Sequence, residues 1–202
     1  QYRKEVTIQE VMESRMISTP ITLLQCSPTS DGASAVILSS ATRARQYIGA
    51  QRKVCVTGWA CGTDSYDDEN LEVLDPTVTR LSRELYERAG IAPEDIDVVQ
   101  LHDAFAPAEI IRMEAMGLAP EGGGARFVAE GETGINGSIP INTDGGLISR
   151  GHPMGATGLA QIIEILRQLR QEAGPRQVEG GPRIGVCHNS GVGGVNMHSF
   201  AR

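Results

Sequence analysis

The sequence has no long apolar run, and no signal peptide is visible at its first residue, Gln1. A membrane-spanning helix needs about 20 consecutive apolar residues, so we expect neither a transmembrane segment nor secretion. Positive charge is scarce as well, because 18 lysines and arginines are outnumbered by 25 aspartates and glutamates, which gives a net charge of −7. This balance argues against a surface that binds nucleic acid or an anionic membrane.

The four cysteines, Cys26, Cys55, Cys61 and Cys187, lack the spacing of a metal-binding motif. Cys55 and Cys61 lie in an apolar, strand-like segment, so we expect buried thiols in a reducing compartment, with the cytoplasm as the location. Residues 63–74 are rich in aspartate and glutamate. Because they lack the fixed glycine and the spacing of a calcium loop, we interpret them as a solvated loop and predict no metal site.

The chain of 202 residues is long enough for one sizeable domain with its own core. Short β-branched segments alternate with segments of helical periodicity, which predicts an α/β fold with a mixed sheet covered by helices on both faces. The expected strands are residues 32–40, 54–60, 97–101, 184–187 and 194–200, and the expected helices are residues 6–17, 42–49, 76–89, 105–116 and 155–170. The glycine-rich residues 118–149 are expected to be a long loop, either functional or mobile.

Three histidines stand at junctions between apolar segments. His152 lies between a glycine and a proline, in a turn that leads into the most apolar helical pattern, and His102 directly follows the expected strand 97–101. His188 lies at the end of a further strand. Polar residues at the ends of buried strands often contact ligands in α/β folds, and histidine readily exchanges a proton near neutral pH. A lone histidine would favour a structural role, but three such junctions in one small domain predict a site.

Five motifs, in their order and spacing, resemble the thiolase superfamily and within it the lipid-transfer-protein (SCP2-type) thiolases. They are SPTSDGASA at residues 27–35, HDAF at 102–105, NTDGG at 142–146, GHP at 151–153 and HNSGVGG at 188–194. The resemblance covers nearly the whole chain but only the C-terminal half of such a thiolase. It implies that residues 1–27 end the loop domain that covers the active site and that residues 28–202 form the C-terminal thiolase domain. The N-terminal half, which carries the nucleophilic cysteine in that family, is not in this sequence.

The resemblance implies an acyltransferase that forms or cleaves a carbon–carbon bond on a coenzyme A thioester, which is a substrate, with no other cofactor. Matching histidines of the family form an oxyanion hole for the enolate, a role that falls here on His102 and His152. His152 would also activate the nucleophilic cysteine. A second oxyanion hole uses backbone N–H groups of the C-terminal glycine turn, where Ser190 and Gly191 are the candidate donors. Two further candidates, for substrate binding and for shaping the loop beside the histidine turn, are Asn142 and Asp144.

The chain departs from the family pattern at both positions that can carry an acid/base cysteine. Ordinary thiolases have this cysteine in a Cys-x-Gly turn, where strand register places His188, and lipid-transfer-protein thiolases have one where this chain has Ala104. Cys187 and His188 are the candidate substitutes, although adjacent residues of a strand point to opposite faces. Steroid side-chain aldolases of the same superfamily carry tyrosines at the two histidine positions, so the histidines argue against that branch.

Three functions stay open on this evidence. The first is a thiolase-like acyltransferase that acts with an N-terminal half in the same protein or in a second chain. The second is a non-catalytic thiolase-like subunit that binds an acyl-CoA or a partner protein, and the third is an aldolase-type carbon–carbon lyase. The resemblance also implies a homo-oligomer and makes a small zinc-ribbon and OB-fold acyl-CoA-binding protein a candidate partner, without nucleic acid or a membrane.

Overall fold

The computed structural model describes residues 3–47, 53–63, 75–191 and 193–202, so most of the acidic stretch at 63–74 lies outside the described residues. The described strands are β1 (Met16–Ser18), β2 (Ile21–Thr22), β3 (Cys55–Gly62), β4 (Val98–Gln100), β5 (Ile184–Gly191) and β6 (Gly194–Ala201). The described α-helices are α1 (Ile8–Glu13), α2 (Ala41–Tyr47), α3 (Pro76–Ala89), α4 (Ala106–Ala115), α5 (Gly124–Ala129), α6 (Gly146–Arg150) and α7 (Met154–Arg170). Within these residues, no helix is both long and apolar enough to cross a bilayer.

In the described part of the chain, the main sheet has four strands in the order β3-β6-β5-β4. The pairs β3–β6 and β6–β5 are antiparallel, whereas β5 and β4 run parallel, so the sheet is mixed as predicted. A parallel bridge joins Val99 of β4 to Ile141, just before the expected NTDGG loop. This order brings the ends of β4 and β5 and the loop after Ile141 to one edge of the sheet.

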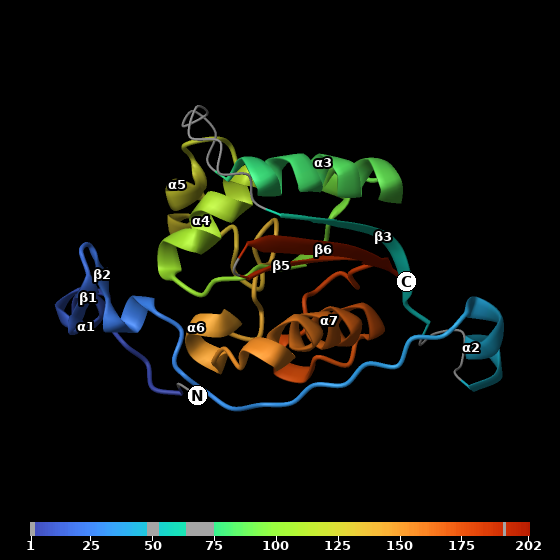
Figure 1. The fold of residues 1–202 in the computed structure, drawn as a ribbon, viewed down its shortest axis with the longest axis horizontal. Helices are drawn as coiled ribbons and strands as arrows, with labels where there is room; N and C mark the ends of the chain where they lie inside the picture. Colours follow the sequence, from blue (N-terminus) through green and yellow to red (C-terminus); the bar gives the residue numbers. More distant parts are fainter. Residues whose placement is uncertain (1–2, 48–52, 64–74, 192) are drawn as a thin grey trace.

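Helices cover both faces of this sheet, with α3 on one face and α7 on the other (Figure 1). Leu81 of α3 belongs to the same apolar cluster as Val186 of β5. On the opposite face, Ile165 of α7 packs in a second cluster with Cys187. A Cβ atom at Gly185 would lie 2.6 Å from Cγ2 of Ile165, so the glycine permits the close approach of α7. The predicted α/β class, with helices on both faces, is confirmed.

Helix α3 begins and ends where the sequence predicts. Oδ1 of Asp75 accepts a hydrogen bond from the backbone nitrogen of Val78 at 3.1 Å, and Pro76 is the first helical residue. Gly90 ends the helix with a φ of 65°, a conformation that glycine adopts without steric cost. These caps satisfy backbone groups that the helix itself leaves unpaired.

The strand expected at residues 32–40 does not form. These residues run as an extended segment past α6 and α7 (Figure 1), with Ile37 96% and Leu38 82% exposed. The β-branched pattern describes what a strand could bury, but burial also needs a neighbouring strand, and none of the described strands pairs with this segment. The prediction is therefore wrong for the described structure.

Cys55 and Cys61 are exposed, so the prediction of two buried thiols is also wrong. β3 is an edge strand, and Gly58 faces α3, since a Cβ atom there would lie 3.0 Å from that of Ala89. Cys61 points to the other face, where α7 packs against β4 and β5 rather than against β3. The apolar sequence of β3 therefore did not show that no described helix covers its second face.

The sequence contains one tryptophan, and this residue, Trp59, also lies on the open face of β3. Its side chain is 54% exposed, and the guanidinium carbon of Arg88 lies 4.7 Å from the ring centre. Arg88 also donates a hydrogen bond to the Trp59 carbonyl at 2.7 Å. The last turn of α3 is thus tied to the edge strand, while the indole remains in contact with solvent.

The expected loop at residues 118–149 contains two short helices, α5 and α6. The carboxylate of Glu114 accepts hydrogen bonds from the backbone nitrogens of Gly122 and Gly124 at 2.8 and 2.9 Å. The Glu114 carboxylate therefore fixes the triple glycine at the start of α5, so it is not a free loop. At the N-terminus, the helix expected over residues 6–17 ends at Glu13 and is followed by the β1–β2 hairpin.

Candidate active site

His102 lies directly after β4, at the edge where β4 and β5 end side by side. Its side chain is buried, and its Nδ1 atom is 3.2 Å from the amide nitrogen of Asn189 on β5. Arg112 on α4 donates a hydrogen bond to the backbone carbonyl of His102. The ring is therefore fixed by the neighbouring strand, and its backbone by the following helix.

His152 lies in the turn between α6 and α7. Gly151 adopts a φ of 101°, which permits the sharp turn, and Pro153 caps the start of α7. Nδ1 of His152 is 2.8 Å from Oγ1 of Thr157, and this hydroxyl donates a hydrogen bond to the Pro153 carbonyl at 3.0 Å. The first turn of the helix thus positions a half-buried imidazole.

The structure brings the two imidazoles together although they are 50 positions apart in the chain. The rings meet edge to face, with centroids 4.8 Å apart and an interplanar angle of 87°. The N-terminal segment crosses both histidine loops, since the Ser27 backbone nitrogen donates to the Ala104 carbonyl at 2.9 Å and Oγ of Ser34 donates to the Ala156 carbonyl at 3.0 Å. A hollow of about 350 Å³ lies between this segment and the start of α7.

Burial and nearby positive charge keep both rings neutral. Burial first, then the charge of Arg112 and the neighbouring imidazole of His152, lower the pKa of His102 from 6.5 to about 3. Burial and the charge of Arg150 also lower the pKa of His152. Each ring therefore presents one N–H donor and one lone pair at neutral pH, which are the groups needed to stabilise an oxyanion and to accept a proton.

Asn142 links the loop after β4 to the strand itself. It holds a φ of 50°, its Oδ1 accepts from the Leu101 backbone nitrogen at 2.8 Å, and its Nδ2 donates to Glu109 at 3.3 Å. Burial first, and then the charge of the nearby Asp103, raise the pKa of Glu109 to about 7. The amide of Asn142 is thus engaged within the protein, and its role in substrate binding stays a prediction.

Asp144 and Asp103 hold the start of α6. Asp144 forms an ion pair with Arg150 at 2.5 Å and accepts from the Gly146 backbone nitrogen at 3.2 Å. Oδ1 of Asp103 accepts from the Leu147 backbone nitrogen at 2.7 Å. Both carboxylates therefore shape the loop that leads to His152, and contact of Asp144 with substrate stays a prediction.

Cys187 and His188 point to opposite faces of β5, and both are buried. Burial raises the pKa of the Cys187 thiol, and burial lowers that of His188, whose Nδ1 lies 3.5 Å from the His102 backbone nitrogen. Both side chains are buried within this chain, and the role of either as the acid/base group stays a prediction. Ser190 is half-buried and Gly191 exposed, where β5 turns into β6.

Three further residues contact the histidines, and the sequence reasoning did not single them out: Arg112, Thr157 and Gln161. Thr157 and Gln161 lie one helical turn apart on α7 and are both buried. Polar residues at i and i+4 on the buried stripe of an apolar helix could have identified this pair.

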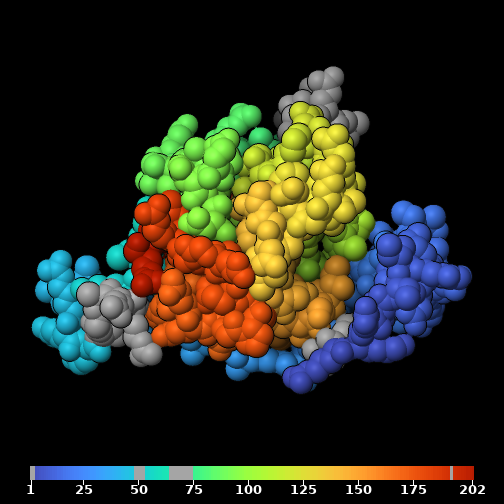
Figure 2. Space-filling model, turned by 180° about the vertical axis from the view of Figure 1, so that it is seen from behind, coloured from blue at the N-terminus to red at the C-terminus, as the bar shows by residue number. Residues whose placement is uncertain are grey.

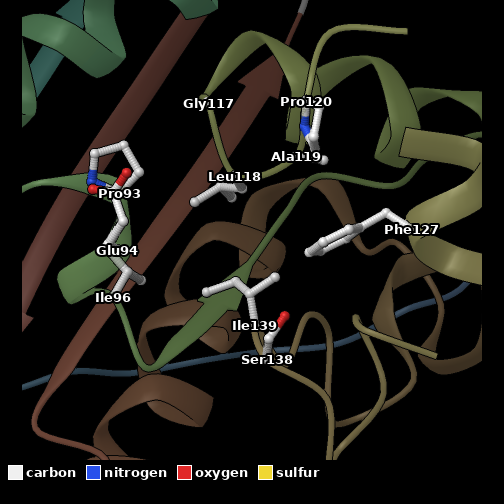
Figure 3. A pocket seen from close by; sticks show the side chains of 10 residues that line it. All are labelled: Pro93, Glu94, Ile96, Gly117, Leu118, Ala119, Pro120, Phe127, Ser138 and Ile139. Carbon is white, nitrogen blue, oxygen red and sulfur yellow. The ribbon is translucent and has the colours of Figure 1, made fainter. Parts of the chain in front are cut away.

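A larger hollow, of about 450 Å³, lies away from the histidines (Figure 3). Phe127, Leu118 and Ile139 line it between the end of α4 and α5. Pro93, Glu94 and Ile96 also line it. Its lining contains none of the candidate site residues.

Residues 64–201 match the family described as "Thiolase C-terminal domain-like". The chain therefore belongs to the thiolase family, and within it corresponds to the C-terminal half. It is 44% identical over 205 residues to the acetyl-CoA acetyltransferase of Methanothermobacter thermautotrophicus. It is also 42% identical over 200 residues to human sterol carrier protein 2, and 36% identical over 193 residues to the benzoylsuccinyl-CoA thiolase subunit BbsB of Thauera aromatica.

The matches cover 100%, 96% and 95% of this chain but 53%, 36% and 50% of those relatives, respectively, so the chain spans about half their length or less. A solved structure, titled "Ltp2-ChsH2(DUF35) aldolase", has the same fold with a TM-score of 0.83 and 24% sequence identity. That match covers 99% of this chain and 52% of the other. The predicted thiolase half-domain fold is confirmed.

Proposed function

We propose that this chain supplies the histidine half of the active site of a thiolase-like acyltransferase. The nucleophilic cysteine would come from a further part of the same protein or from a second chain. The observation that carries the proposal is the edge-to-face pair of neutral imidazoles, His102 and His152, at the sheet edge. The names of two relatives, an acetyl-CoA acetyltransferase and a benzoylsuccinyl-CoA thiolase subunit, support a coenzyme A thioester as the substrate class.

In this proposal His102 stabilises the oxygen of the thioester carbonyl as negative charge develops on it. A neutral imidazole with a proton on Nε2 donates a hydrogen bond to that oxygen without itself losing a proton. Fixed donors aimed at a developing oxyanion contribute about 2.7–4 kcal/mol each to lowering the barrier. The burial of His102 strengthens such a bond, because little water competes for the same oxygen.

His152 serves as the base for the cysteine thiol. The Thr157 hydroxyl donates its proton to the Pro153 carbonyl, so it accepts from Nδ1–H of His152. The lone pair is then on Nε2, the ring atom that faces away from the helix start. This nitrogen takes the proton when the thiol becomes a nucleophilic thiolate, and the half-buried position leaves room for a cysteine from outside the chain.

Two observations favour a second candidate, a non-catalytic thiolase-like subunit that binds an acyl-CoA or a partner protein. Ala104 stands where related thiolases have an acid/base cysteine, and Cys187 is buried with a raised pKa. In that role the histidine pair would contact a bound thioester without turnover. A homo-oligomer and an acyl-CoA-binding partner protein are compatible with both proposals.

The test is a thioester cleavage assay on the complete protein, with every partner chain present. We expect His152→Ala to abolish turnover and His102→Ala to lower kcat by about 100- to 1000-fold, the cost of losing an oxyanion donor. Activity of His152→Ala equal to that of the unsubstituted protein would overturn the enzyme proposal. Acyl-CoA binding without turnover in the unsubstituted protein would support the second candidate, and release of an aldehyde or ketone without consumption of free CoA would indicate a lyase.

A further inference from the structure

Gln161 is a polar side chain in the middle of the apolar helix α7, and it is fully buried. A buried amide costs about 1–3 kcal/mol unless its donors and acceptors are paired. The Gln161 amide is paired on both sides: Nε2 donates to the His188 carbonyl at 3.1 Å, and Oε1 accepts from Nδ2 of Asn189 at 2.9 Å. The same Nδ2 lies 3.2 Å from Nδ1 of His102. These contacts form a chain of hydrogen bonds from a backbone carbonyl to the imidazole.

The direction of these hydrogen bonds follows from the first of them, which the His188 carbonyl accepts. A backbone carbonyl can only accept, so Gln161 must turn its NH₂ group towards His188 and its oxygen towards Asn189. That oxygen can also only accept, so Asn189 must present its NH₂ group. The same NH₂ group then faces Nδ1 of His102, which must therefore carry a lone pair rather than a proton.

From this geometry we propose that Gln161 and Asn189 are positioning residues that hold His102 as the tautomer with its proton on Nε2. The inference rests on the proposed function, because it explains how His102 keeps a donor directed at an oxyanion. The opposite tautomer would present a lone pair at Nε2 and repel the developing negative charge. Neither Gln161 nor Asn189 needs to contact the substrate for this effect.

The surroundings of His102 agree with a neutral ring. Arg112 donates to the backbone carbonyl of His102, and its positive charge opposes protonation of the imidazole. His152 meets the ring edge to face, and no carboxylate of the described residues forms a hydrogen bond or an ion pair with the ring. The choice between the two neutral tautomers is therefore left to the amide of Asn189.

The substitution Asn189→Asp reverses the donor and acceptor roles between residue 189 and Nδ1 of His102. A carboxylate can only accept, so it pulls a proton onto Nδ1 of His102 and produces either the opposite tautomer or the imidazolium. The matched control is Asn196→Asp, since Asn196 pairs with Asn189 across β5 and β6 but is exposed. The control adds the same charge at nearly the same place without touching the hydrogen-bond chain.

The first measurement is a long-range ¹H–¹⁵N correlation spectrum of the histidine rings in the complete protein, with His102 assigned by the loss of its peaks in His102→Gln. We expect an unprotonated Nδ1 and a protonated Nε2 in the unsubstituted protein and in Asn196→Asp, and a protonated Nδ1 in Asn189→Asp. A proton on Nδ1 of the unsubstituted protein overturns the inference. This result needs no variant at Asn189, so the inference stays falsifiable even if Asn189→Asp does not fold.

The second measurement is the rate of thioester cleavage. We expect Asn189→Asp to lower kcat by about 100-fold with KM nearly unchanged, and Asn196→Asp to change kcat by less than about twofold. If the tautomer changes as described but kcat does not, the inference about Gln161 and Asn189 stands and the proposed oxyanion role of His102 fails. If kcat falls without any change of tautomer, the inference fails and Asn189 acts in another way.

Discussion

The described chain has two parts that differ in how far their apolar side chains are buried. We call residues 3–47 the arm, and residues 53–63, 75–191 and 193–202 the body. The body buries two apolar clusters, one on each face of its sheet, whereas Thr22 is the one buried residue among the described residues of the arm. Figure 2 shows the first residues of the arm as a lobe beside the body. Apolar content alone thus does not reveal which residues a chain buries by itself.

The largest expected effect is at Leu81, which is fully buried in the body. Leu81→Ala leaves a cavity between α3 and the sheet and should lower the free energy of unfolding by about 3–5 kcal/mol. Urea denaturation of the 202-residue chain, followed by circular dichroism, measures this change. A loss below about 1 kcal/mol would show that the body is not a close-packed unit.

A somewhat smaller effect is expected at Gly146, the first residue of α6, in the loop that leads to His152. Its φ is 60°, and a Cβ atom would lie 2.1 Å from Oδ2 of Asp103, so Gly146→Ala should cost about 2–4 kcal/mol. Gly155 provides the control, because a Cβ there meets no atom within 4 Å and its φ is not positive. Gly155→Ala should be neutral or slightly stabilising in the same urea titration, and equal effects of the two changes would contradict the described loop.

The body should also be sensitive to acid. Burial and the Arg112 charge lower the pKa of His102 to about 3 in the folded protein, while the unfolded chain titrates near 6.5. Between these values the unfolded state binds one more proton, so stability falls as the pH falls through this window. From pH 6.5 to pH 5 the loss contributed by His102 should be about 1.6 kcal/mol. His102→Gln should reduce this slope, measured by urea titrations at several pH values, and an unchanged slope would refute the assignment.

The smallest expected effect is at Leu38, in the arm. Because 82% of this side chain is exposed, Leu38→Ala should change the stability of the 202-residue chain by less than about 0.5 kcal/mol. The same change in a longer protein that contains this chain is the sharper comparison. A cost there similar to that of Leu81→Ala would mean that other residues cover the arm.

Local chemistry predicted much of the body. Asp75, Pro76 and Gly90 marked the ends of α3, because caps act within one helical turn and need no knowledge of the rest of the fold. The mixed sheet and the layers of helices followed from the alternation of patterns. Residues 32–40 and the thiols of β3 were mispredicted for a common reason: whether an apolar strand is buried depends on neighbours that the segment itself does not encode.

The site was predictable in part. His102 and His152 were identified from their junctions and from the family resemblance, and the structure places their rings in contact. The links through Gln161 and Asn189 could not be derived from spacing, because they join α7, β5 and the end of β4 across the sheet. The spacing of residues predicts contacts along one helix or strand. It does not predict contacts between elements that are far apart in the sequence.

The position of Trp59 gives the molecule an optical reporter. An indole in contact with water fluoresces at longer wavelength than a covered one, and this indole belongs to the one tryptophan of the sequence, on the open face of the edge strand. The 202-residue chain should therefore show red-shifted emission that iodide quenches readily. Any protein surface that covers β3 would shift the emission to the blue and protect it from quenching, so assembly on this face can be followed by light without a label.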